Sequence, residues 1–505
     1  MSNITQNMSV GKSSTATLTS KRRRQVSRVF LVCWLVYSVF WIPYIVREHF
    51  PAMTLAEQGT LNVERYLGWT DDIFQGPKRG AFINNNPGAS LTGAIPLLVL
   101  RPFLAKVDSW NQRQPRPQTP APDEGEVFGR AVQEGRGVYF LLIAFLTTAA
   151  VMAPATAGML AFFCSRLIEA GVSGASAGLI AILCGIGTPL LFRAAGLNHN
   201  LLVADAGFTA LLVLWEPNDG PLTFQSTLIA GLLCGYALLC DYSGIVVASI
   251  GALYILQRSS GKHNRMRAFA GFSVGMIPGT AILLIYQTWA FGGLFHLSQQ
   301  YMPATAQTVH GYRGFDWPSP ALAWALLVDP RFGLFAYCPA LVLAFAAPFV
   351  RQIRYKLPRR ETRLLLIYFG LFLLFCAANR YSWLQPLTGF RYLLPVAPGL
   401  ALLAVQAAQA LPRPVRRVLA GISCIQMLVV TAAHENDLRL TLHTLRERHF
   451  EPFWLIRLRQ AGTPGTWIHA SEWLAAIALG VALYNVLVLL REAAKPSGPH
   501  EAQSA

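Results

Sequence analysis

The segment VFLVCWLVYSVFWIPYIV (residues 29–46) decides the class of this protein. It contains about 18 consecutive uncharged and mainly apolar residues, enough for a helix to cross the hydrocarbon core of a bilayer. The chain as a whole follows the same pattern, with 53% hydrophobic residues, 13% charged residues and a mean hydropathy of +0.39. Soluble domains usually carry about 25% charged residues. The composition therefore predicts an all-α, polytopic membrane protein.

The net charge of +17 is distributed as short basic clusters beside apolar segments. This arrangement is typical of the positive-inside rule, which places such clusters on the cytoplasmic side. A nucleic-acid-binding protein would instead gather its basic residues on one soluble face, so we exclude nucleic acid as a partner. The clusters are KRRRQVSR (21–28), QRSSGKHNRMR (257–267), RQIRYKLPRR (351–360) and RPVRR (413–417).

Requiring every basic cluster to be cytoplasmic predicts about 12 transmembrane helices with both termini inside. Residues 1–28 are expected to form a disordered cytoplasmic tail, 29–490 the transmembrane domain, and 491–505 a second cytoplasmic tail. The first extracytoplasmic loop, 47–137, is expected to carry juxtamembrane helices, and its apolar run 89–107 is interpreted as an interfacial helix. The predicted spans are 29–46, 138–165, 175–193, 198–215, 225–241, 243–257, 268–289, 333–350, 363–378, 393–410, 415–433 and 470–490.

Unusual polar residues collect on the extracytoplasmic side of this predicted topology. Ionisable residues at the edge of a membrane span are costly and therefore mark candidate functional sites. The first loop contains GWTDDIFQGPKRGAFINNNPGASL (68–91), and shorter polar motifs follow as GLNHN (196–200), LLCDYSG (238–244) and GFRYLLP (389–395). The candidates are Glu48, Asp71, Asp72, Lys78, Arg79, Asn84, Asn85, His199, Asn200, Asp241 and Arg391.

Carboxylates and cations at one membrane surface fit sugar transfer from a polyprenyl phosphate. A carboxylate can accept the proton of an acceptor hydroxyl, and arginine or lysine can stabilise the departing phosphate. His199 has no partner at metal-ligand spacing. We therefore predict no metal site and no cofactor, and no pattern indicates a divalent cation.

The order of several motifs resembles the GT-C superfamily of membrane glycosyltransferases, which includes the protein O-mannosyltransferases and the lipid A aminoarabinose transferase. The resemblance is stronger to uncharacterised bacterial members and covers roughly residues 29–410. It rests on LAEQGTLNVERYLGWTDDIF (55–74), FINNNPGAS (82–90), NHN (198–200), AFGGLFHLSQQY (290–301), DPRFGLFAYCPAL (329–341) and GFRYLLPVAPGL (389–400).

The resemblance implies an inverting glycosyltransferase in a bacterial cytoplasmic membrane, with its active site outside. It implies a polyprenyl-phosphate sugar as donor and an extracytoplasmic glycan, lipid or protein as acceptor. Glu48 occupies the position of the acidic catalytic residue after the first span, and Asp72 matches a second acid of the family. Arg391 matches an arginine of the family. Asn85 stands where related proteins commonly have a lysine expected to contact the lipid phosphate. Asp71, Lys78, Arg79, Asn84, Asn85, His199, Asn200, Asp241 and Arg391 are the predicted substrate-binding residues.

Simpler interpretations of these residues remain open. Glu48 and Arg47 could form an ordinary interfacial pair, the aspartates could cap a helix, and Arg391 could extend towards lipid headgroups. A transporter or lipid flippase would place its ionisable residues near the bilayer midplane, and a non-catalytic scaffold would scatter them. The arrangement of Glu48, Asp72 and Arg391 in space discriminates between these alternatives.

Overall fold

A computed structural model describes residues 2–77, 80–115, 127–215, 217, 220–350, 357–387, 390–435 and 437–495, without the side chains of 2–19 and 385–387. The described chain is mostly helical. Its α-helices are α1 (Ser2–Val39), α2 (His49–Gln58), α3 (Gly88–Val99), α4 (Arg101–Arg113), α5 (Val127–Gln133), α6 (Gly137–Thr147), α7 (Ala153–Glu169), α8 (Gly174–Ile186), α9 (Leu190–Ala194), α10 (His199–Leu214), α11 (Phe224–Cys240), α12 (Gly244–Arg258), α13 (Lys262–Phe291), α14 (Pro320–Val328), α15 (Leu334–Tyr337), α16 (Arg359–Ala378), α17 (Ala397–Ala408), α18 (Arg413–Ala433), α19 (Thr441–Glu447), α20 (Phe453–Gln460) and α21 (Gly465–Ala494). The short helices are η1 (Glu64–Tyr66), the π-helix η2 (Thr148–Met152), η3 (Ser298–Gln300), η4 (Pro339–Phe349), η5 (Arg380–Leu387) and η6 (Leu394–Val396), and the strands are β1 (Ile73–Gln75) and β2 (Ala81–Ile83).

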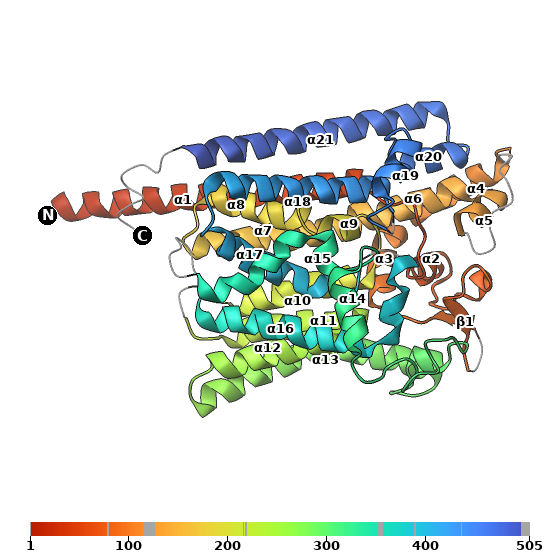
Figure 1. Cartoon of the computed structure of the whole chain (residues 1–505), viewed down its shortest axis with the longest axis horizontal. Coiled ribbons are helices and arrows are strands. Elements are labelled where there is room, and N and C mark those ends of the chain that lie inside the picture. The colour runs from red at the N-terminus through yellow and green to blue at the C-terminus, as the bar shows by residue number, and fades with distance from the viewer. Residues whose placement is uncertain are drawn as a thin grey trace.

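The long helices run roughly side by side along the longest axis of the molecule (Figure 1). Helix α1 begins and α21 ends towards the left end of this view. Helices α2 to α6, the strand β1 and the helices α19 and α20 lie towards the right end. The polar first loop is therefore at the end of the bundle opposite to the start of α1.

Among the residues that the structure describes, five helical stretches are long and apolar enough to cross a membrane: Gly137–Glu169, α13, α16, α18 and α21. The bent pair α3 and α4 would make a sixth if it formed one span. The predicted count of about 12 is not confirmed. Several other predicted spans coincide with apolar helices of 10–17 residues, such as α10, α11 and α12. At 1.5 Å per residue, such helices are shorter than the hydrocarbon core of about 30 Å.

The amino-terminal span needs a correction. The span expected at 29–46 ends as a helix at Val39, because Pro43 lacks a backbone N–H and forces the residue before it out of helical geometry. The disordered cytoplasmic tail expected over residues 1–28 stays a prediction, and helix α1 begins at Ser2. Its described side chains are held in place: Arg22 pairs with Glu169, and Arg28 Nη1 lies 2.8 Å from Glu492 Oε1.

The run 89–107 is not a single interfacial helix. It divides into α3 and α4, which are bent by 82° at Leu100. Helix α3 packs against α2, α10 and α11 within the molecule, whereas α4 buries one face against α6. Pro96 near the end of α3 cannot donate to the preceding turn, which favours the break. The all-α prediction is also incomplete, since β1 and β2 form an antiparallel hairpin in the first loop.

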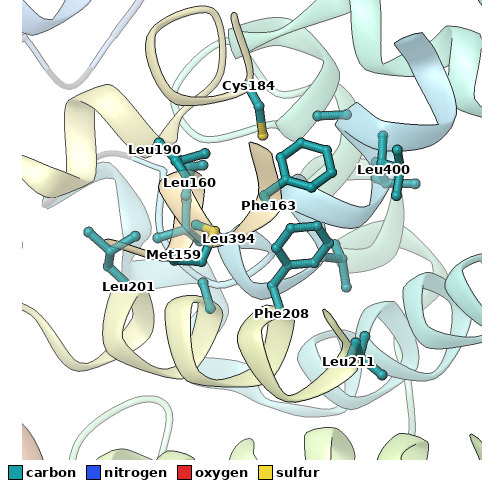
Figure 2. Packing of buried hydrophobic residues seen from close by; sticks show 14 of the residues in the cluster. Met159, Leu160, Phe163, Cys184, Leu190, Leu201, Phe208, Leu211, Leu394 and Leu400 are labelled. Atoms are coloured by element: carbon teal, nitrogen blue, oxygen red, sulfur yellow. The ribbon is translucent and has the colours of Figure 1, made fainter. Parts of the chain in front are cut away.

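The main apolar core draws side chains from many helices, among them α1, α7, α8, α10, α11, α12, α16 and α17, and one part of it lies between α7, α8, α10 and α17. Figure 2 shows residues of these helices around Phe163 and Phe208, whose ring centroids are 5.4 Å apart in an edge-on arrangement. Both side chains are buried. Such aromatic packing contributes stability beyond the burial of area, so it fixes α10 against α7.

A buried arginine connects the helices of the first loop. Arg136 is 2% exposed. Its guanidinium Nη2 lies 3.0 Å from Glu57 Oε1 on α2, and its Nε lies 2.9 Å from Asp108 Oδ1 on α4. Tyr139 on α6 donates a hydrogen bond to the same Glu57 oxygen. Because removing one partner of a buried ion pair is strongly destabilising, these contacts hold α2, α4 and α6 as a unit.

Candidate functional site

Glu48 is the centre of the largest group of predicted site residues. It directly precedes α2 and is 3% exposed. Its carboxylate oxygen Oε1 lies 2.5 Å from His199 Nδ1 and accepts a hydrogen bond of 2.7 Å from Asn85 Nδ2. Arg47 Nε lies 3.8 Å from the same oxygen. The sequence prediction that Glu48 lies at a polar site is therefore consistent with its surroundings.

The asparagine run is held in place by its neighbours. Asn86 donates a hydrogen bond of 2.9 Å to the carbonyl of Leu238 on α11. Gly88, the first residue of α3, approaches α11 so closely that an added Cβ would lie 2.7 Å from the backbone N of Cys240. Only glycine fits such an approach, and it fixes Asn85 beside Glu48.

His199 is the first residue of α10. The helix begins there because the Asn198 side chain accepts a hydrogen bond from the Leu201 N–H, a typical N-cap. The imidazole is 5% exposed, and its second nitrogen, Nε2, lies 3.8 Å from Asp241 Oδ2. Asp241 follows the end of α11, and its other oxygen accepts a hydrogen bond from the Ser243 N–H.

Asp72 joins the site through Arg47. The guanidinium Nη1 of Arg47 lies 2.8 Å from Asp72 Oδ1, and Asn84 Nδ2 donates to the same oxygen at 3.2 Å. The hairpin explains this second contact, since Ile73 pairs with Ile83 and the residues that flank this pair face each other. The Asp72 side chain is 42% exposed, so this acid borders solvent.

Two further arginines lie close enough for their charges to act on the site. Arg193 at the end of α9 interacts electrostatically with Arg391, Glu48 and Arg47. Arg391 is 8% exposed, and its guanidinium carbon lies 4.8 Å from the centre of the Tyr392 ring. The site therefore combines guanidinium groups from three separate segments with the Glu48 carboxylate.

The electrostatic environment keeps Glu48 ionised. Burial alone would raise the pKa of its carboxyl group. The hydrogen bond to His199, the electrostatic effect of its imidazole and the charge of Arg47 outweigh burial and hold this pKa far below its ordinary value. These contacts therefore favour the ionised form of Glu48.

The remaining predicted residues contribute differently. Asp71 is exposed and makes no hydrogen bond or ion pair with the part of the chain that the structure describes. Asn200 is buried beside His199, and its Nδ2 has no hydrogen-bond partner among the described residues. Lys78 and Arg79 lie outside the described residues. Across the ranges that the structure describes, no group of three or more His, Cys, Asp or Glu side chains could hold a metal ion.

Sequence reasoning missed Arg193. The residue stands at the end of the predicted span 175–193, where a basic side chain has an ordinary explanation as an interfacial anchor. One signal could have found it: the predicted topology placed the end of this span on the same side of the membrane as Glu48. Asn85, considered as a replacement for a phosphate-binding lysine, instead contacts Glu48 and His199.

Two buried histidines near the site predict how stability depends on pH. Burial lowers the pKa of His49 to about 4, and burial with the charges of Arg193 and Arg448 lowers the pKa of His434 to about 3. The unfolded chain binds these protons near pH 6.5, so stability falls as the pH drops from about 6.5 towards 4. Each histidine contributes up to about 1.4 kcal/mol per pH unit in this window.

Thermal unfolding in detergent between pH 4.5 and 7.5 measures this dependence. The His49→Gln variant is expected to lose about half of the slope, since only His434 then contributes. A slope identical to that of the unmodified protein would contradict the assignment to His49.

Comparisons of the chain with protein-family models, with curated proteins and with solved structures found no match. We therefore infer function from the residues around Glu48 and their contacts.

Proposed function

We propose that the protein is a GT-C-like membrane glycosyltransferase. It transfers a sugar from a polyprenyl-phosphate-linked donor to a hydroxyl group of an extracytoplasmic glycan, lipid or protein, with inversion at the anomeric carbon. The observation that carries the proposal is the group around Glu48, in which a buried carboxylate contacts the imidazole of His199 and lies beside Arg47. Arg193 interacts electrostatically with Glu48 and with Arg391.

The acidic half of the site supports activation of the acceptor. A hydroxyl group becomes a competent nucleophile when a positioned base removes its proton during attack. Glu48, Asp72, Asp241 and His199 are the ionisable groups of the site that can exchange a proton, and Arg47 connects Glu48 with Asp72. Their arrangement in one chain of contacts supports an enzyme over a scaffold with scattered polar residues.

The basic half supports departure of the lipid phosphate. Breaking the bond between sugar and phosphate leaves negative charge on the phosphate oxygens, and guanidinium groups stabilise such charge through paired hydrogen bonds. Arg193, which interacts electrostatically with Glu48, and Arg391, which interacts with Arg193, supply two such groups. Apolar helices that could cross a membrane, including α13 and α16, provide surfaces beside which the lipid tail can remain in the bilayer.

A transporter or lipid flippase is the second candidate, and one observation favours it. Asp205 in the middle of α10 is 6% exposed and accepts a hydrogen bond of 2.8 Å from Thr156 on α7. Buried acids within a membrane domain are typical of transport pathways. A flippase would move the lipid-linked sugar across a vesicle bilayer and leave its sugar–phosphate bond intact.

The test uses the purified protein in lipid nanodiscs with radiolabelled polyprenyl-phosphate sugars and an extract of envelope glycans and lipids as acceptors. We expect release of polyprenyl phosphate together with labelled acceptor. The Glu48→Gln variant is expected to be slower by about 10²–10⁴-fold, the usual contribution of general acid–base catalysis, in which Glu48 takes part. Asp71→Asn is the matched control, because Asp71 is exposed and outside the group of contacts.

One result would contradict the proposal: translocation of intact donor across vesicles without any transfer of sugar. Unchanged transfer in both Glu48→Gln and Asp72→Asn would leave the transfer reaction standing and would remove both acids from it.

A further inference from the structure

The contacts of Glu48 make its carboxylate a poor proton acceptor. Its Oε1 receives the Asn85 amide at 2.7 Å and faces His199 Nδ1 at 2.5 Å, and Arg47 adds a positive charge at 3.8 Å. Donors and cations that stabilise the ionised form lower the affinity of a carboxylate for a proton. General-base catalysis instead needs a group whose pKa is close to the working pH. Glu48 is better suited to orienting another group than to taking the proton.

The same contacts determine how His199 is protonated. An ionised carboxylate only accepts hydrogen bonds, so the proton of the neutral imidazole lies on Nδ1, which faces Glu48. The nitrogen Nε2 then carries a lone pair. The carboxylate oxygen Oδ2 of Asp241 lies 3.8 Å from this nitrogen, which is beyond hydrogen-bond distance.

Asp72 is a weaker candidate for the base. Its Oδ1 already accepts hydrogen bonds from Arg47 and Asn84, and its side chain is 42% exposed. Hydrogen bonds from a guanidinium group favour the charged form of a carboxylate and occupy the oxygen that would accept the proton of an alcohol. Asp241 is placed differently from Asp72: it faces the unprotonated nitrogen of His199, and its side chain is 27% exposed to solvent.

We propose that Glu48 and His199 form a catalytic pair in which Nε2 of His199 removes the acceptor proton and Asp241 stabilises the resulting imidazolium. This inference rests on the proposed glycosyl transfer and names the atom that acts as its base. The acceptor oxygen forms a bond to the anomeric carbon as its proton moves to Nε2. The bond from that carbon to the phosphate oxygen breaks, and its electron pair leaves with the polyprenyl phosphate.

The charges around the imidazole fit this sequence of events. Glu48 and Asn85 contact Nδ1, and Asp241 faces Nε2. The protonated ring therefore lies between two carboxylates, which stabilise it after the proton has moved. Arg47 and Arg193 act on Glu48 electrostatically, which favours the ionised form of that carboxylate. The partial exposure of Asp241 leaves it in a position to return the proton to water.

The first experiment does not depend on activity. Hydrogen–deuterium exchange at the imidazole carbon between the two ring nitrogens, followed by mass spectrometry over a pH series, reports the protonation of His199 in the intact protein. Loss of the Glu48 charge in Glu48→Gln is expected to move this titration to lower pH by about 1–3 units, the usual effect of a nearby opposite charge. His310, which is exposed, provides an internal control whose titration should not move. An unchanged titration of His199 would overturn the pairing.

The second experiment measures transfer with radiolabelled polyprenyl-phosphate sugars over the same pH range. His199→Asn retains an N–H donor near the position of Nδ1 but lacks Nε2, so a structural role alone would be preserved. We expect this variant to lose about 10²–10⁴-fold in kcat and to lose the acidic limb of the pH profile. Added imidazole should partly restore His199→Ala, and His310→Gln should behave as the unmodified protein.

The outcomes separate the two proposals. If the unmodified protein transfers no sugar, the glycosyltransferase proposal fails, and the exchange titration still decides whether Glu48 and His199 are paired. If the unmodified protein is active and His199→Asn remains within about threefold of it, the assignment of Nε2 as the base is wrong, because a positioned general base contributes at least about 10²-fold.

Discussion

The Arg391→Gln variant is expected to transfer sugar with kcat/KM lower by about 10²–10³-fold, as for the removal of one charged stabiliser of a transition state. Glutamine retains a polar side chain of similar reach but removes the positive charge. Arg391 is buried over Tyr392 and interacts electrostatically with Arg193 near Glu48. In a site so poorly hydrated, a guanidinium group stabilises developing phosphate charge much more strongly than in water.

Two comparisons make this prediction specific. Arg391→Lys keeps the charge but loses the planar pair of donors, so its activity should lie between those of the unmodified protein and Arg391→Gln. Arg363→Gln removes the same charge from an exposed position near the start of α16 and should leave transfer unchanged. Thermal unfolding confirms that each variant is folded. A folded Arg391→Gln protein with nearly full activity would exclude Arg391 from phosphate binding.

The Gly275→Leu variant is expected to be destabilised by at least about 3 kcal/mol, the upper part of the usual range for overpacking. Helices α11 and α13 approach through small residues: Gly231 and Gly235 on α11 face a run of glycines on α13 that includes Gly275 and Gly279. A Cβ on Gly275 would lie 2.2 Å from the carbonyl oxygen of Leu228, a backbone atom that cannot move aside alone. Such small residues at intervals of four are typical of close helix pairs in membranes.

A matched substitution separates packing from the general effect of leucine in a helix. Gly480 lies within α21, and an added Cβ there would have no atom within 4 Å. Because leucine favours helix more than glycine does, Gly480→Leu should be neutral or slightly stabilising. Unfolding temperatures and the fraction of monodisperse protein in detergent measure both variants. Equal stability of Gly275→Leu and the unmodified protein would contradict the close packing of α11 and α13.

The sequence by itself indicated the class of the protein and marked part of the polar group around Glu48. Low charge and long apolar segments indicate a membrane protein because the cost of burying charge in lipid acts on every segment separately. The same local rule marked Glu48, His199 and Asp241 as exceptional, and the structure brings these three together. This local rule failed where the composition of a segment carries no information about its neighbours in space. The break between α3 and α4 and the ends of the shorter helices depend on what each segment packs against.

Only the tertiary structure decided which polar groups meet and what each can do. Glu48 and His199 are 151 positions apart, and Asn85 and His199 are 114 apart, so their contacts follow from how α2, α3 and α10 pack. The same packing brings Arg193, an ordinary-looking residue at the end of an apolar segment, near Glu48. The physical reason is that hydropathy acts within a segment, whereas a hydrogen bond or an ion pair depends on distances of a few ångströms between segments. The proton affinity of Glu48, and with it the choice of His199 as the proposed base, is fixed by those distances.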